Sequence, residues 1–113
     1  MHIESIDERF LARVEELILK RMADPHFDSR AMARELGMSR MQLHRRLCAL
    51  TEQTPGAYIR IRRLRRAAQL LEHRTGTVTE ISRSVGIRNV SNFAKRFREL
   101  YGQSPSEYAA GKY

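Results

Sequence analysis

Residues 43–58 read LHRRLCALTEQTPGAY, and residues 93–108 read FAKRFRELYGQSPSEY. At a shift of 50 positions, the second stretch repeats the glutamine, the hydroxyl residue, the proline and the tyrosine of the first. The matched pairs are Gln53 with Gln103, Thr54 with Ser104, Pro55 with Pro105, and Tyr58 with Tyr108. Apolar matches alone can arise by chance in a helical chain. Proline, tyrosine and cap positions in one register indicate a duplicated structural unit.

The repeat extends upstream to a glycine in each unit. Leu36-Gly37-Met38 corresponds to Val85-Gly86-Ile87 at a shift of 49, so the second turn holds one extra residue. Each unit therefore predicts a short helix, a turn in which glycine supplies left-handed backbone, and a longer helix. The residue one turn before the glycine must be small where two helices cross steeply, and Ala33 and Ser82 stand there. An ordinary helical hairpin uses the same glycine, but two units in register favour helix-turn-helix.

Helical periodicity runs through the chain, and no segment alternates strictly between apolar and polar residues. The pattern predicts an all-α fold of seven helices, with two homeodomain-like helix-turn-helix subdomains joined by a long central helix. The expected divisions are a lead-in helix in 1–26, the first subdomain in 27–54, the linker helix in 55–74 and the second subdomain in 75–113.

Caps and apolar stripes support these helices. The expected N-caps are Asp28, Ser39 (with Gln42), Thr54 (before Pro55), Thr77 (with Glu80) and Ser104 (with Pro105 and Glu107). The expected inward residues are Ile6, Phe10, Val14, Leu17 and Ile18; Met32, Ala33 and Leu36; Leu43, Leu47 and Leu50; Ile61, Leu64, Ala68 and Leu71; Ile81 and Val85; Phe93, Phe97 and Leu100. Cys48, Tyr58 and Tyr108 are also interpreted as packing residues.

The charge balance points to a polyanionic partner. Lys and Arg outnumber Asp and Glu 21 to 13, for a net charge of +8. Residues 1–26 carry a net −2, so the excess lies after them and this front segment is interpreted as a lid or linker. Nucleic acid and an anionic membrane surface both fit such a balance.

Other classes of protein find little support. No apolar run approaches membrane-spanning length, and no signal peptide pattern is present. One cysteine suits a reducing cytoplasm, and four scattered histidines predict no metal site. No phosphate-binding loop or nucleophile–base pair is visible, so we expect neither an enzyme nor a cofactor.

The longer helix of each unit is expected to place its N-terminal half against base edges in the major groove. In the first unit, the predicted base contacts are Met41, His44 and Arg45, and the predicted phosphate contacts are Ser39, Arg40 and Arg46. In the second unit, the predicted base contacts are Ser91, Asn92 and Lys95, and the predicted phosphate contacts are Asn89 and Arg96. Arginine at position 45 suits a bidentate contact with guanine. The second face is smaller and less charged, so it should tolerate more variation in the DNA.

Residues 60–66 read RIRRLRR and decorate the central helix with arginine. Arg60 and Arg62 are predicted to contact phosphates, whereas Arg63, beside Leu64, is predicted to have an internal partner. A helix of about 18 residues spans roughly 27 Å, somewhat less than the ~34–36 Å between successive major grooves. One chain could therefore engage two adjacent grooves as a monomer, at an asymmetric site in bent duplex DNA.

The sequence closely resembles the AraC/XylS family of bacterial transcription regulators from about Asp28 to Tyr108. The resemblance rests on Leu36-Gly37-Met38-Ser39, on Leu47 to Pro55, on Val78 to Gly86 and above all on residues 93–97 and 101–108. It implies two helix-turn-helix subdomains joined by a long helix, monomeric binding to adjacent grooves, and activation through RNA polymerase. Carried over by position, the base contacts fall on Met41, His44, Arg45, Ser91 and Lys95.

The sequence departs from the family pattern at Glu52, Ser82, Ile87 and Asn92, which puts the docking of the second unit in question. The front segment resembles the lead-in helix of a domain at the output end of a two-component regulator, and short free-standing members are also known. The helices account for the whole sequence, so we expect no effector pocket in it.

Two alternatives remain open. One keeps DNA binding without regulation, as a module of a recombinase or an architectural protein. The other is a helical protein-interaction or anionic-membrane module, which would need apolar residues exposed opposite the arginines.

Overall fold

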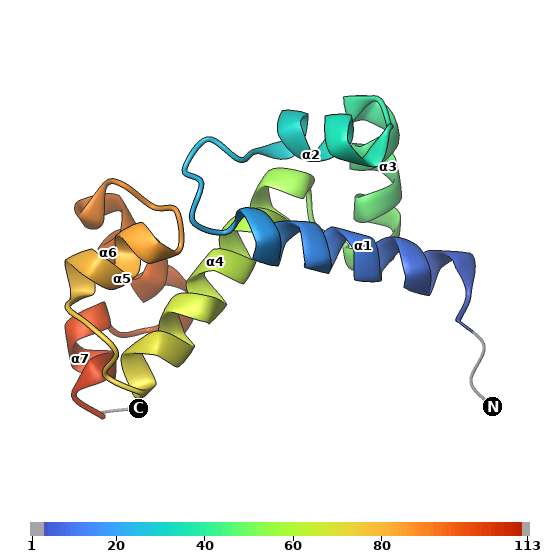
Figure 1. The fold of residues 1–113 in the computed structure, drawn as a ribbon. Coiled ribbons are helices and arrows are strands. Elements are labelled where there is room, and N and C mark those ends of the chain that lie inside the picture. The colour runs from blue at the N-terminus through green and yellow to red at the C-terminus, as the bar shows by residue number, and fades with distance from the viewer. Residues whose placement is uncertain (1–3, 112–113) are drawn as a thin grey trace. The chain divides into compact units, whose positions relative to one another are not determined.

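A computed structural model describes residues 4–111, and over this range the fold is all-α, as predicted (Figure 1). The helices are α1 (Ile6–Arg21), α2 (Ser29–Leu36), α3 (Arg40–Thr51), α4 (Pro55–Glu72), α5 (Val78–Ser84), α6 (Val90–Tyr101) and α7 (Pro105–Ala109). They form two compact units. Unit 1 comprises residues 4–21 and 27–59, and unit 2 comprises residues 22–26 and 60–111.

Helix α1 is part of the core of unit 1. Its Phe10, Val14 and Ile18 are buried at successive turns, in the same unit as Met32, Ala33, Leu43 and Leu47 of α2 and α3. The expectation that residues 1–26 form only a lid or linker is therefore wrong. The acidic residues Asp7, Glu8 and Glu16 of this helix are exposed, whereas its inner side completes a three-helix core.

The apolar stripe of α1 is shorter than predicted. Ile6, expected to face inward, is 72% exposed at the first residue of the helix. A capping box that the sequence analysis overlooked begins this helix: the Glu8 amide donates to Ser5 Oγ, and the Ser5 amide donates to the Glu8 carboxylate, both at 3.1 Å. The helix therefore starts from a local polar signal, and burial begins one turn later.

The two helix-turn-helix turns share one hydrogen-bond pattern. The Met38 amide donates to the Ala33 carbonyl at 2.9 Å, and the Ile87 amide donates to the Ser82 carbonyl at 2.9 Å. The preceding glycines, Gly37 and Gly86, have φ of 68° and 82°. Both turns are thus Schellman-type helix ends, in which a left-handed residue lets the chain reverse.

The structure gives a reason for serine at position 82, where the family pattern commonly has alanine. The Ser82 side chain is fully buried, and its Oγ donates to the Ile87 carbonyl at 2.6 Å, across the turn. The hydroxyl thus adds a second hydrogen bond between Ser82 and Ile87, beside the backbone bond described above.

The predicted N-caps of α2, α3, α5 and α7 are all confirmed. At the start of α4, Thr54 Oγ1 accepts from the Ala57 amide at 3.2 Å.

Unit 2 has an aromatic core. The Phe97 ring lies 5.7 Å from that of Phe93, 4.6 Å from Tyr101 and 5.3 Å from Tyr108. Leu100, expected in the buried face, is 41% exposed. Tyr101 occupies the inward position instead, because it continues the spacing of four residues set by Phe93 and Phe97. Partial burial raises the pKa of the Tyr101 hydroxyl.

The matched tyrosines of the repeat anchor to glutamates. The Tyr58 hydroxyl donates to Glu15 of α1, and the Tyr108 hydroxyl donates to Glu72 of α4 at 2.5 Å. Both rings are buried, as predicted. Each tyrosine thereby fastens the end of its repeat to the first helix of its unit.

Arg63 is the internal arginine that the sequence predicted. Its Nη2 donates to the Asp24 carbonyl oxygen at 2.7 Å, within unit 2. Burial lowers the pKa of its guanidinium, and the nearby Asp24 charge opposes that shift. Arg63 therefore joins α4 to the segment 22–26.

Candidate DNA interface

The start of α3 is fixed by a reciprocal cap. Ser39 Oγ accepts from the Gln42 amide at 3.1 Å, and Gln42 Oε1 accepts from the Ser39 amide at 2.9 Å. Leu43 and Leu47 are fully buried, so the rotation of α3 about its axis is set by the core. The first turn of the helix is therefore held rigidly at the end that is predicted to meet DNA.

The predicted base contacts of α3 are all exposed. Met41 is 68% exposed, and His44 and Arg45 are also exposed. Met41 and Arg45 lie one turn apart, opposite the buried leucines. Cys48 continues this line and is half-buried, less enclosed than its interpretation as a packing residue implied.

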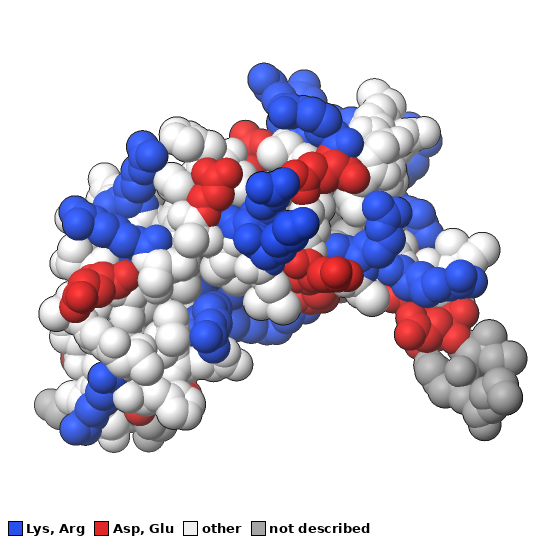
Figure 2. Space-filling view, in the orientation of Figure 1, with Lys and Arg blue, Asp and Glu red and all other residues white. Residues whose placement is uncertain are grey.

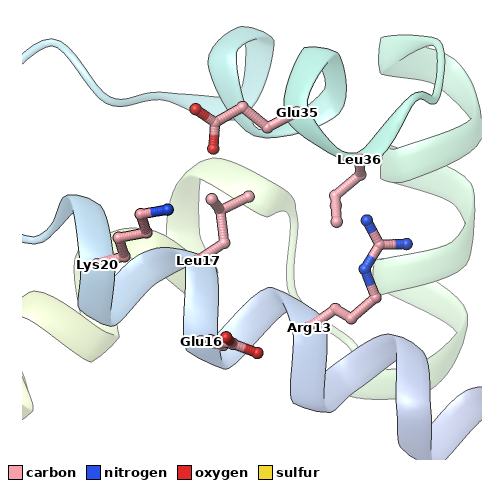
Figure 3. Close-up of a pocket in the computed structure, with 6 residues that line it drawn as sticks. All are labelled: Arg13, Glu16, Leu17, Lys20, Glu35 and Leu36. Carbon is pink, nitrogen blue, oxygen red and sulfur yellow. The ribbon is translucent and has the colours of Figure 1, made fainter.

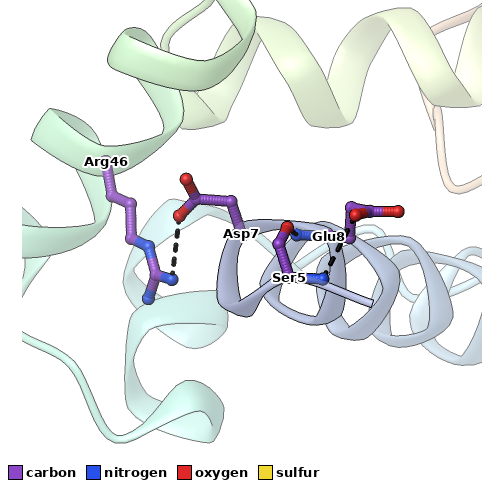
Figure 4. A network of polar contacts seen from close by, with 4 residues as sticks. All are labelled: Ser5, Asp7, Glu8 and Arg46. Carbon is purple, nitrogen blue, oxygen red and sulfur yellow. Dashed lines mark hydrogen bonds and ion pairs between the residues drawn. The ribbon is translucent and has the colours of Figure 1, made fainter. Parts of the chain in front are cut away.

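Arg46 differs from its neighbours because α1 engages it. Its guanidinium lies 4.1 Å from the centre of the Phe10 ring, and its Nη2 lies 3.3 Å from Asp7 Oδ1 (Figure 4). The predicted phosphate contact at this position would compete with an ion pair to the acidic start of α1. Arg40, by contrast, is exposed.

A groove in unit 1 runs beside the exposed side of α3. Its polar lining is Arg13, Gln42, Arg45 and Arg46, and its apolar lining includes Phe10 and Met38. Arg13, on α1, was not among the predicted site residues. The signal in the sequence for Arg13 was its position three residues after Phe10 and next to Val14, both of which are buried.

A second depression in unit 1, between α1 and α2, has balanced charge. Arg13 and Lys20 line it together with Glu16 and Glu35, while Leu17 and Leu36 extend into the space between the two helices (Figure 3). Glu35 also forms an ion pair with Arg21. Two cations against two carboxylates make this an unfavourable place for a polyanion.

The start of α6 uses a different cap. The side chain of Asn89, a predicted phosphate contact, accepts from the Asn92 amide at 2.9 Å and so serves as the N-cap. The predicted base contacts Ser91, Asn92 and Lys95 are exposed, and Phe93 and Phe97 face the core. The arrangement of α6 in unit 2 thus parallels that of α3 in unit 1.

Two arginines of α6 have different surroundings. Arg96, a predicted phosphate contact, lies 3.6 Å from Glu99 in an ion pair along the helix. Arg98 is exposed and was not predicted as a site residue. Ser91, Lys95 and Arg98 are spaced by four and then three residues, which places them on one stripe of a helix. That spacing was the signal that could have found Arg98.

Basic side chains are spread over the surface shown in Figure 2, with acidic side chains among them. On α4, Arg60 is exposed and Arg62 is half-buried. Over residues 4–111, no group of three or more His, Cys, Asp or Glu could hold a metal ion. Within the same range, no helix has the length and apolar character needed to cross a membrane.

Known proteins share this architecture and sequence pattern. A family model described as a helix-turn-helix domain matches residues 32–111. The HTH-type transcriptional activator RhaS of Escherichia fergusonii is 34% identical over 110 residues, covering 94% of this chain and 39% of RhaS. Histidine kinase P4 of Formosa agariphila is 39% identical over 106 residues, covering 94% of this chain and 8% of that protein. The chain thus spans less than half the length of these relatives.

Solved structures of related domains have the same fold as this chain. The DNA-binding domain of AdpA, a global transcriptional factor crystallised with a target DNA, superposes with a TM-score of 0.82 at 31% identity, covering 89% of this chain and 90% of that one. The C-terminal domain of AraT, a response regulator from Geobacillus stearothermophilus, has the same fold with a TM-score of 0.85 at 22% identity, covering 95% and 88%. The chain belongs to the AraC-type family of helix-turn-helix DNA-binding domains of transcription regulators.

Proposed function

We propose that this domain activates transcription by placing α3 and α6 in two adjacent major grooves of one asymmetric DNA site. The observation that carries the proposal is the duplicated geometry. Each unit holds a Schellman turn, a side-chain cap and a recognition helix with its apolar side buried and its polar side exposed. Helix α4 is continuous and contributes residues to both units, which suits one chain that binds without a dimer partner.

In this proposal the base contacts are Met41, His44 and Arg45 from α3 and Ser91, Asn92 and Lys95 from α6. The phosphate contacts are Ser39, Arg40, Arg46, Arg60, Arg62, Asn89 and Arg96. Arg45 contributes most to discrimination, because its planar fork matches the two acceptors of guanine. We add Arg98 to the residues of α6 that face the DNA bases, because it lies on the same stripe of the helix as Ser91 and Lys95.

An activating role rests on the similarity to RhaS, a protein named as a transcriptional activator. Activation would use a contact with RNA polymerase from a surface that DNA leaves free. The similarity to a histidine kinase and the fold shared with the AraT domain of a response regulator support a place at the output end of a two-component system.

Selection of bound sequences from a random duplex pool, repeated at several salt concentrations, tests the DNA-binding proposal. We expect enrichment of an asymmetric site with two short boxes about one helical turn apart. A palindrome, or no enrichment, would refute the proposal that both recognition helices bind one asymmetric site. Binding by shape alone, with bending but no preferred bases, would favour an architectural module instead.

Two substitutions then separate base contacts from phosphate contacts. Arg45→Ala should cost about 1–3 kcal/mol on the selected site and relax preference at one position. Arg62→Ala should weaken binding to all duplexes alike. It should also lower the slope of log affinity against log salt by about one, the value expected for one lost phosphate contact. An equal loss on every duplex for Arg45→Ala would show that Arg45 does not contact a base.

A further inference from the structure

The segment 22–26 follows α1 in the sequence but is packed in unit 2. Arg63 of α4 donates to the Asp24 carbonyl oxygen at 2.7 Å. A Cβ on Gly86 would lie 2.4 Å from the Met22 carbonyl oxygen, so the segment lies directly against the turn between α5 and α6. Two backbone positions of the segment are thus fixed beside the second helix-turn-helix turn.

Basic side chains meet at this junction. Arg83 and Arg88 line a surface notch together with Ala23, Pro25 and Gly86. His26 Nε2 lies 3.1 Å from Arg88 Nη2. Within residues 4–111, neither arginine of the notch is ion-paired with a carboxylate.

Asp24, the one acidic residue of the segment 22–26, contacts groups other than the two arginines of the notch. The Asp24 carboxylate accepts from the His26 amide at 2.9 Å, and its charge acts on Arg63. The two exposed guanidinium groups of the notch therefore keep their charge available to an anion.

We propose that Arg88, Arg83 and His26 form a clasp for one phosphate of the DNA backbone beside the second recognition helix. The clasp rests on the proposed function and extends its DNA contacts to the segment 22–26. Arg88 immediately precedes Asn89, the N-cap of α6. Since the N-terminal half of a recognition helix lies against the bases, a cation just before it lies at the level of the backbone.

The chemistry of the group fits a phosphate diester. A guanidinium has five N–H donors in a planar fork, so a bond to His26 leaves Arg88 able to hold two phosphate oxygens. A histidine that accepts at Nε2 is the neutral form with its proton on Nδ1. His26 is therefore a positioning residue that orients Arg88, and the arginines supply the charge.

A backbone anchor of this kind suits the second recognition helix. Its predicted base-contact stripe is small, and the nearby Arg96 is paired with Glu99. A phosphate contact from outside α6 would fix the register of this helix on the duplex without adding sequence preference.

The test is fluorescence anisotropy of the full chain with a selected duplex and a scrambled duplex, across a series of NaCl concentrations. The variants are Arg88→Ala, Arg88→Lys, His26→Ala and the double variant of Arg88→Ala with His26→Ala. Arg66→Ala, which removes an exposed arginine of α4, is the matched control for net charge. Thermal unfolding of each variant checks that the fold is retained.

Arg88→Ala should lower the slope of log affinity against log salt by about one on both duplexes. Arg88→Lys should keep the slope but lose affinity several-fold, because the fork is gone. His26→Ala should lower the affinity for the duplex when Arg88 is present, but it should cause no further loss of affinity in a chain that already carries Arg88→Ala. An unchanged slope in Arg88→Ala, an equal fall in Arg66→Ala, or multiplying losses for Arg88 and His26 would overturn the clasp. A wild-type chain that selects no sequence refutes the proposed function itself. A wild-type chain that selects a sequence, together with unchanged affinity and an unchanged salt slope in Arg88→Ala, refutes only the clasp.

Discussion

Gly37 and Gly86 occupy matching positions of the repeat, yet the structure predicts that they tolerate alanine very differently. Both have positive φ, where alanine costs about 1–2 kcal/mol relative to glycine. A Cβ on Gly37 would meet nothing within 4 Å. A Cβ on Gly86 would lie 2.4 Å from the Met22 carbonyl oxygen and 3.1 Å from the Arg63 guanidinium. Relieving a backbone clash in a packed region costs about 1–3 kcal/mol more. Gly86→Ala should therefore destabilise unit 2 by about 2–5 kcal/mol.

Asparagine separates the two causes, because its short polar side chain tolerates left-handed backbone. Gly37→Asn should be milder than Gly37→Ala, whereas Gly86→Asn should keep the clash with the Met22 carbonyl oxygen and still cost about 1–3 kcal/mol. Urea unfolding followed by circular dichroism measures the global effect, and amide hydrogen exchange assigns it to a unit. Equal losses at the two glycines, or full tolerance of Gly86→Asn, would refute the role assigned to the Met22 contact.

Three further perturbations test other contacts. Glu52→Gly should raise the free energy of unfolding by about 1 kcal/mol, because Glu52 holds a φ of 61° where the repeat has Gly102, and urea unfolding would show it. Asp7→Asn should release Arg46 and steepen the salt dependence of binding to random duplex DNA, whereas Glu4→Gln should not; identical slopes would argue against the competition. Hydrogen bonds from the Thr77 backbone and side chain lower the pKa of the Glu80 carboxyl, so its capping contribution is present above the unfolded pKa and lost as pH falls through the folded one. The stability advantage of wild type over Glu80→Gln should therefore shrink on acidification, and a difference independent of pH would contradict this.

The sequence was most informative where structure is local. Caps join residues three positions apart, and a left-handed turn depends on one glycine, so both follow from spacing. The exposure of Met41, His44, Arg45, Ser91, Asn92 and Lys95 also agrees with helical periodicity, because burying two residues one turn apart orients the rest. Which of these side chains touch DNA stays a prediction.

The repeat that relates residues 36–58 to residues 85–108 determined the two helix-turn-helix units, their turns and their exposed stripes. Only the tertiary structure decided the partners of residues far apart in the chain. It placed α1 in the core of unit 1, brought Asp7 to Arg46, and seated the segment 22–26 against Gly86. Periodicity fixes the direction in which a side chain leaves its helix, but not which distant segment packs there. That choice depends on the shapes and charges of whole surfaces, which no short stretch of sequence contains.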